Sequence, residues 1–138
     1  MLKELIEQGY GEQQDFNCAE KIFYGANEAY HLGLGKNALR LSAGFGGGMG
    51  IGSICGVLTA SVMVLSCMFV DKQAHESDRI KKLTQELFQS YRQEMGEIDC
   101  EPLKTRYRTE EYKCRDVLVK AAAILDHITA RESSLNRE

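Results

Sequence analysis

The chain has 138 residues, of which 43% are hydrophobic and 27% are charged, enough apolar side chain for one domain with a continuous core. The formal net charge is −3 and the Lys and Arg residues are scattered among acids, so the sequence lacks the basic stripe that binds nucleic acid through its phosphates. The first residues lack the apolar run and the small-residue cleavage site of a secretory signal, and we expect a cytoplasmic protein.

Apolar residues recur with helical spacing along almost the whole chain, and Pro102 is the single proline. This pattern predicts an all-α fold, a single-domain bundle of about five to seven helices over residues 1–138 around a buried apolar central helix. A short amphipathic helix comes first. The next helix is expected over about residues 17–32, with Asn17 as its N-cap and Gly33 and Gly35 as stops. Its inward face carries Cys18, Ile22, Ala26 and Ala29.

The central helix follows a short helix over about residues 36–43 and a glycine-rich run. We expect it over about residues 53–70, with Ser53 as its N-cap, hydrophobic all round and buried by its neighbours. Residues 54–70 form an uncharged stretch of 17, at the lower limit of about 17 for a membrane-spanning helix. Because small and polar residues interrupt this stretch and mixed charges follow it, we expect no stable membrane span.

Three further helices are predicted in the second half of the chain. One begins at Ser77 or Asp78 and ends at Gly96, with an apolar stripe of Ile80, Leu83, Leu87, Tyr91 and Met95. A short helix begins at Asp99 or Cys100, with Pro102 in its first turn, and Thr109 is the expected N-cap of the last long helix. The polar tail, residues 132–138, is expected to fray.

Five cysteines carry most of the chemical information: Cys18, Cys55, Cys67, Cys100 and Cys114. An odd number in a cytoplasmic chain argues against structural disulfides, and any one of them alone would be interpreted as a small buried hydrophobe. However, Cys18, Cys55 and Cys100 fall in the first turns of predicted helices, where the helix dipole favours the thiolate. Cys114 is expected about one turn deeper, and it and Cys18 lie on inward faces, where they could meet.

Cys67 differs from the other four cysteines. It lies twelve residues after Cys55 on the same predicted helix, so about 18 Å of rise and 120° of rotation separate the two, and we interpret it as structural. The remaining four thiols have three possible uses: dithiol/disulfide exchange, a zinc site or an iron–sulfur cluster. No Cys-x-x-Cys pair is present, and the spacing leaves all three open.

The glycine-rich turn could bind an anionic cofactor through the backbone N–H groups of Gly46, Gly47, Gly48 and Gly50. Neither a dinucleotide-binding nor a P-loop motif is present, so a role in packing is favoured. Gly52, Gly56 and Ala60 recur every four residues, a small-residue ridge that lets another helix approach closely. The same ridge could support a homodimer.

These residues together resemble the C_GCAxxG_C_C family of redox-active proteins, which is named for four cysteines and a Cys-Gly-Ala-x-x-Gly motif. The matching features are Asn17-Cys18-Ala19, the glycine run from Gly44 to Gly50, Cys55-Gly56, and the later cysteines Cys100 and Cys114. The chain departs from the motif at Val57, in place of alanine, and at Ala60, in place of glycine. The resemblance implies a helical protein with redox-active or metal-binding thiols at Cys18, Cys55, Cys100 and Cys114, and leaves Cys67 outside the set.

The leading hypothesis is therefore a thiol-based redox protein that exchanges electrons with an unidentified partner, with Cys55 as the expected nucleophile. The first alternative is a metal-binding protein in which Cys18, Cys55, Cys100 and Cys114 hold zinc or an iron–sulfur cluster. The second is a helical interaction or dimerisation module whose cysteines are only structural.

Overall fold

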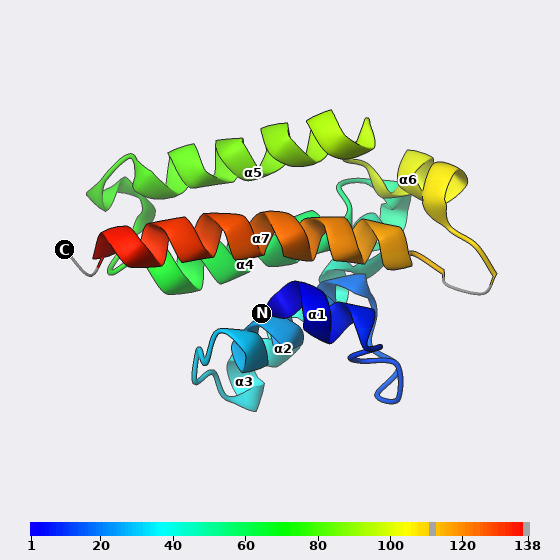
Figure 1. Ribbon diagram of the computed structural model, residues 1–138, viewed down its shortest axis with the longest axis horizontal. Coiled ribbons are helices and arrows are strands. Elements are labelled where there is room, and N and C mark those ends of the chain that lie inside the picture. Colours follow the sequence, from blue (N-terminus) through cyan, green and yellow to red (C-terminus); the bar gives the residue numbers. More distant parts are fainter. Residues whose placement is uncertain (111–112, 137–138) are drawn as a thin grey trace.

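The computed structural model describes residues 1–110 and 113–136. Within them the chain forms seven α-helices and no β-strand, which confirms the all-α prediction. The helices are α1 (Leu2–Glu7), α2 (Cys18–Ala29), α3 (Lys36–Leu39), α4 (Gly56–Phe69), α5 (Arg79–Met95), α6 (Cys100–Tyr107) and α7 (Arg115–Asn136). Helices α4, α5 and α7 run side by side along the long axis, α1 to α3 cover one side, and α6 closes one end (Figure 1).

Helix α4 is the buried centre of the molecule, in contact with α2, α5 and α7. Val57, Leu58, Val64 and Leu65 are all fully buried, and each such side chain contributes about 1.5–3 kcal/mol through the hydrophobic effect. The helix begins later than expected, with Cys55 rather than Ser53 as its N-cap. No helix in the described part of the chain combines the length and the apolar character that crossing a membrane requires.

Packing and hydrogen bonds hold the first turn of helix α1 against the rest of the protein. Leu2 and Ile6 are buried, and α1 packs on α2 and α7. The Asp126 carboxylate accepts hydrogen bonds from the backbone N–H groups of Leu2 and Lys3, both at 3.0 Å, and from the Tyr30 hydroxyl at 2.6 Å. These bonds satisfy N–H groups that the end of a helix leaves unpaired.

Helices α2 and α4 approach each other closely at Gly56. A Cβ atom on Gly56 would lie 2.9 Å from the Phe45 carbonyl oxygen and 3.2 Å from the Ala19 Cβ, so a larger residue would push the helices apart. Ala60 is fully buried. Gly52 lies outside the helix in a turn, with φ +71°, so the predicted ridge is wrong at that residue. Because Gly56 and Ala60 are covered within the chain, they offer no dimer surface.

Helix α5 agrees with its prediction, with Asp78 as N-cap and Gly96 at its end in the left-handed conformation, φ +83°. The last helix differs at its start. Thr109 does not cap it, because the backbones of Thr109 and Lys113 pair with each other in a turn, through N–H···O bonds of 3.1 and 2.8 Å. The helix instead starts after Cys114, whose carbonyl oxygen accepts a bond from the Leu118 N–H.

The end of α7 also differs from the expected fraying after residue 131. The helix continues to Asn136, and Glu132 is buried between Arg79 and Arg131, with N···O distances of 3.1 and 3.0 Å. The Arg79–Glu132 pair ties the final turns of α7 to α5. Residues 137 and 138, the end of the predicted frayed tail, lie outside the described residues.

Candidate functional site

All four candidate cysteines lie at the starts of helices that meet at one end of the bundle. Cys18 is the first residue of α2, Cys55 is the N-cap of α4, Cys100 is the first residue of α6, and Cys114 immediately precedes α7. The prediction is confirmed for Cys18 and Cys100 and wrong for Cys114, which lies at the helix start and not one turn deeper. Helix N-termini carry unpaired N–H groups and a partial positive charge, which favour an anion nearby.

The start of α2 is fixed by a capping box. The Asn17 side chain accepts a hydrogen bond from the Glu20 N–H, and the Glu20 carboxylate accepts one from the Asn17 N–H, both at 2.9 Å. The Asn17 side-chain amide also donates to the Ala43 carbonyl oxygen at 2.9 Å. Gly46 lies directly against Asn17, where a Cβ atom would overlap the Asn17 side chain. The glycine-rich turn therefore packs directly against Asn17, the residue that precedes Cys18.

The starts of α4 and α6 are joined by a short antiparallel bridge between Ile54 and Asp99. The Cys55 N–H donates to the Ile98 carbonyl oxygen at 2.8 Å, and the Cys100 N–H donates to the Ser53 carbonyl oxygen at 2.6 Å. The pairing of residues 53–55 with residues 98–100 explains why Ser53 is not the N-cap of α4. The bridge holds the backbones of Cys55 and Cys100 close together.

Gly48 lets the glycine-rich turn pack against this bridge. Its φ is +63°, and a Cβ atom would lie 2.5 Å from the Ser53 backbone and 2.8 Å from the Cys100 Cβ. Gly50 has a similar φ of +74°, but no described atom would lie within 4 Å of its Cβ. Of the four glycines proposed as a cofactor loop, Gly47 lines the cavity described next, whereas Gly46 and Gly48 serve close packing.

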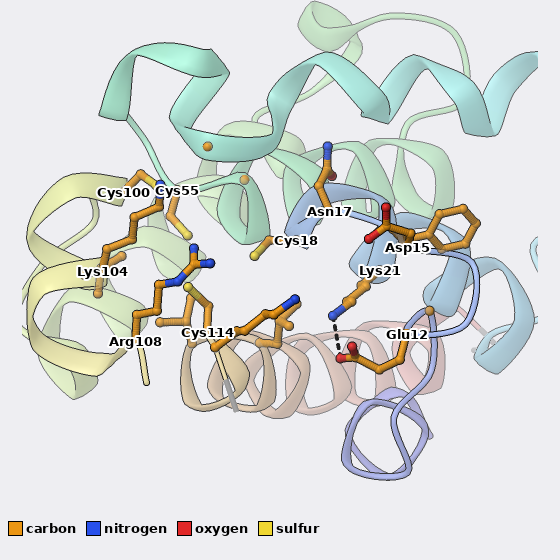
Figure 2. A pocket seen from close by; sticks show the side chains of 18 residues that line it. Glu12, Asp15, Asn17, Cys18, Lys21, Cys55, Cys100, Lys104, Arg108 and Cys114 are labelled. Atoms are coloured by element: carbon orange, nitrogen blue, oxygen red, sulfur yellow. Dashed lines mark hydrogen bonds and ion pairs between the residues drawn. The ribbon is translucent and has the colours of Figure 1, made fainter. Parts of the chain in front are cut away.

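The four thiols line one cavity of about 210 Å³ (Figure 2). Its wall also carries four cationic side chains, Lys21, Lys104, Arg108 and Lys113, and two acidic ones, Glu12 and Asp15. Glu12 is paired with Lys21 at 2.7 Å. Cations therefore outnumber acids around the thiols, and the helix starts add to this positive potential.

Cys18 and Cys114 lie close enough in the cavity to shift each other's pKa in opposite directions. Interaction with the Cys18 side chain lowers the pKa of Cys114 to about 6, with Arg108, Lys104 and Lys21 contributing in the same direction against burial. Interaction with Cys114, together with burial, raises the pKa of Cys18 well above its ordinary value. Of the two thiols, Cys114 therefore ionises more readily.

Cys55 and Cys100 remain protonated at neutral pH. Burial raises the pKa of Cys55 to about 12, although the Val57 N–H acts in the opposite direction, and only 4% of the residue is exposed. Burial also raises the pKa of Cys100, with nearby Lys104 opposing it. This differs from the expectation that Cys55 is the nucleophile. Reactivity follows the thiolate, and among the four cavity thiols only Cys114 has a lowered pKa.

Cys67 does not line the cavity, which agrees with its exclusion from the set. Its side chain is exposed on the surface of α4 and is not part of the core. All five cysteines are free thiols in the structure.

The metal hypotheses require several ligands around one point. In residues 1–110 and 113–136, no three His, Cys, Asp or Glu side chains are grouped so that they could hold a metal ion. A tetrahedral zinc site has three or four protein ligands, and an iron–sulfur cluster generally has four thiolates. The four thiols share a cavity, but their present arrangement does not fit either centre.

The sequence reasoning missed the cations of the cavity. Lys104 and Arg108 follow Cys100 at steps of four residues, a spacing that places side chains on one face of a helix, with Arg108 directly after the last helical residue. Lys21 follows Cys18 by three residues on α2. A search for cations on the cysteine face of each predicted helix would have found these three.

The chain matches a known protein family. Residues 16–128 match the model of a protein family described as "Putative redox-active protein (C_GCAxxG_C_C)". The match covers the helix starts of all four cavity thiols. None of the curated proteins and none of the solved structures matches the chain significantly.

Proposed function

Because this chain belongs to the C_GCAxxG_C_C family of redox-active proteins, we propose that Cys18 and Cys114 are the dithiol/disulfide pair of a thiol-based redox reaction. The observation that carries the proposal is that both side chains line one open cavity, near enough to shift each other's pKa in opposite directions. Two cysteines need to be close together to form a disulfide without large backbone movement.

The charge distribution assigns an order to the two residues. Cys114 acts first, because its pKa of about 6 makes it a thiolate at neutral pH and because a thiol whose pKa lies near the ambient pH is an efficient attacking group. Cys18 acts second, as the resolving thiol. Once Cys114 is in a mixed disulfide, its negative charge no longer raises the pKa of Cys18.

The reaction is an exchange with a substrate disulfide. The Cys114 thiolate attacks one substrate sulfur, the substrate S–S bond breaks, and the first substrate thiolate leaves and takes up a proton from water. Cys18 then loses its proton to water and attacks the Cys114 sulfur, which releases the second substrate thiolate, protonated in turn, and leaves a Cys18–Cys114 disulfide. Two electrons pass from the protein dithiol to the substrate disulfide, and a reducing dithiol reverses the sequence.

Cys55 and Cys100 have a later role in this proposal. Both line the same cavity, and burial keeps both protonated at neutral pH. The bridge between residues 54 and 99 holds their backbones together. They form a second pair that exchanges with the first only after Cys114 has reacted.

Redox titration tests the proposal directly. The reduced protein is equilibrated in buffers of defined thiol/disulfide ratio, free thiols are blocked by alkylation, and disulfides are mapped by mass spectrometry. We expect a reversible Cys18–Cys114 disulfide with one midpoint, absent from Cys114→Ser and unchanged in Cys67→Ser, the control. A midpoint that Cys114→Ser leaves unchanged, or no reversible disulfide, would overturn the proposal.

A further inference from the structure

The cations of the thiol cavity are unequally neutralised. Lys21 is paired with Glu12, whereas Lys104, Arg108 and Lys113 form no ion pair within the described residues. The two acids of the wall belong to the segment before α2 and lie at the opposite side of the cavity from Lys104 and Arg108 (Figure 2). Among the described residues, one side of the cavity therefore carries cations without a paired acid.

The same cations also line a second cavity next to the thiol cavity. The backbone positions of Lys104 and Arg108 lie about 6 Å and about 12 Å from that of Cys100 along α6, given a rise of about 1.5 Å per residue, and their side chains reach back to line the thiol cavity (Figure 2). A neighbouring cavity of about 380 Å³ is lined by the same Lys104, Arg108 and Lys113, together with Thr109 and Glu110. A ligand with sulfur at the thiols would thus place its other end among three cations and one acid, Glu110.

Size and access favour a small ligand. The thiol cavity of about 210 Å³ is smaller than the roughly 300–1,000 Å³ of drug-sized ligand sites. Cys18 and Cys114 are half-buried within it, and Cys55 and Cys100 are buried. A disulfide held on the surface of a folded protein would have to enter this space to reach the Cys114 sulfur.

Building on the proposed redox function, we propose that the substrate is a small disulfide, or the thiol formed from it, that carries carboxylate groups. Its carboxylates bind Lys104, Arg108 and Lys113, while its sulfur meets Cys114. Carboxylates are suitable partners because arginine binds them through paired hydrogen bonds and lysine binds them as a point charge.

The test uses three disulfides of similar size and different charge: 3,3′-dithiodipropionate (−2), bis(2-hydroxyethyl) disulfide (0) and cystamine (+2). Each rate of oxidation of the reduced protein is divided by the rate of the same disulfide with free 2-mercaptoethanol. We expect the normalised rate of the dianion to exceed that of the dication at least about tenfold at low ionic strength, and the ratio to fall as salt is added. The ratio is independent of how much Cys114 is ionised, since the nucleophile is the same.

A pair of double variants locates the effect. Lys104→Gln/Arg108→Gln should bring the ratio close to one, whereas Lys81→Gln/Lys82→Gln, which removes the same charge from exposed positions of α5, should leave it unchanged. Equal normalised rates, or no salt dependence in the unaltered protein, would overturn this inference while the redox function stands. If none of the three disulfides oxidises the protein, the proposed function fails and the inference fails with it.

Discussion

Cys18, at the start of α2, and Cys114, immediately before α7, line the same cavity and shift each other's pKa in opposite directions. The pKa of Cys114 is lowered and that of Cys18 is raised, so Cys114 is the thiol that ionises more readily. The order of events in a disulfide exchange follows from it, with the thiolate attacking and the neighbouring thiol resolving.

The pH dependence of Cys114 reactivity tests this contact. The alkylation rate of Cys114 should rise with a midpoint near pH 6, well below the ordinary cysteine value of about 8.5. Cys18→Ala removes the side chain that lowers the pKa of Cys114 and should move the midpoint upward, whereas Cys18→Ser keeps an O–H group at that position and should preserve most of the shift. Thiolate absorbance at 240 nm in the variants measures both. A midpoint near 8.5 that Cys18→Ala leaves in place would contradict the pairing.

Labelling of the native protein should distinguish Cys114 from Cys55. At pH 7 a small alkylating reagent should modify Cys114 faster than Cys55 by at least about tenfold, because burial covers Cys55 and raises its pKa to about 12. Mass spectrometry of peptides sampled over time gives both rates. In urea, where the fold is lost, the alkylation rates of the two cysteines should converge. If Cys55 is modified before Cys114 in the native protein, Cys55 and not Cys114 is the nucleophile.

Alanine substitutions at Gly48 and Gly50 form a matched pair for measuring how close packing of the turn affects the free energy of unfolding. Both have positive φ, so alanine at either position costs about 1–2 kcal/mol of backbone energy. Gly48→Ala adds a clash with the Ser53 backbone and the Cys100 Cβ and should lose a further 1–3 kcal/mol, roughly the cost of overpacking a core. Urea unfolding of the reduced proteins gives the difference. Equal losses of stability for the two variants would mean that the glycine-rich turn does not pack closely against the bridge between residues 54 and 99.

Metal content separates the redox proposal from the zinc and iron–sulfur alternatives. Protein purified anaerobically should keep its helical content after treatment with a chelator, because no described group of three ligands supports the fold through a metal ion. Circular dichroism, metal analysis and a visible spectrum provide the readouts. Stoichiometric zinc or iron, lost in Cys114→Ser and retained in Cys67→Ser, would favour a metal centre over the disulfide pair.

Local sequence signals predicted the elements well wherever local bonds decide the structure. Asn17 caps α2 as expected because its partner Glu20 lies three residues away, and Gly96 ends α5 because glycine accepts a positive φ. Ser53 and Thr109 are equally suitable cap residues by type, yet neither caps a helix. Their segments pair with backbone at residues 98–100 and at Lys113, and residue type alone does not reveal such a partner.

The sequence by itself determined an all-α bundle around an apolar central helix and a set of four thiols that excludes Cys67, because helical periodicity and capping depend on neighbours a few residues away. Only the tertiary structure decided that the pKa of Cys114 is lowered and that of Cys55 is raised. A thiol's pKa depends on burial and on nearby groups, and here Cys18 comes from α2 and two of the cations from the α6 segment. These groups meet only when the helices pack.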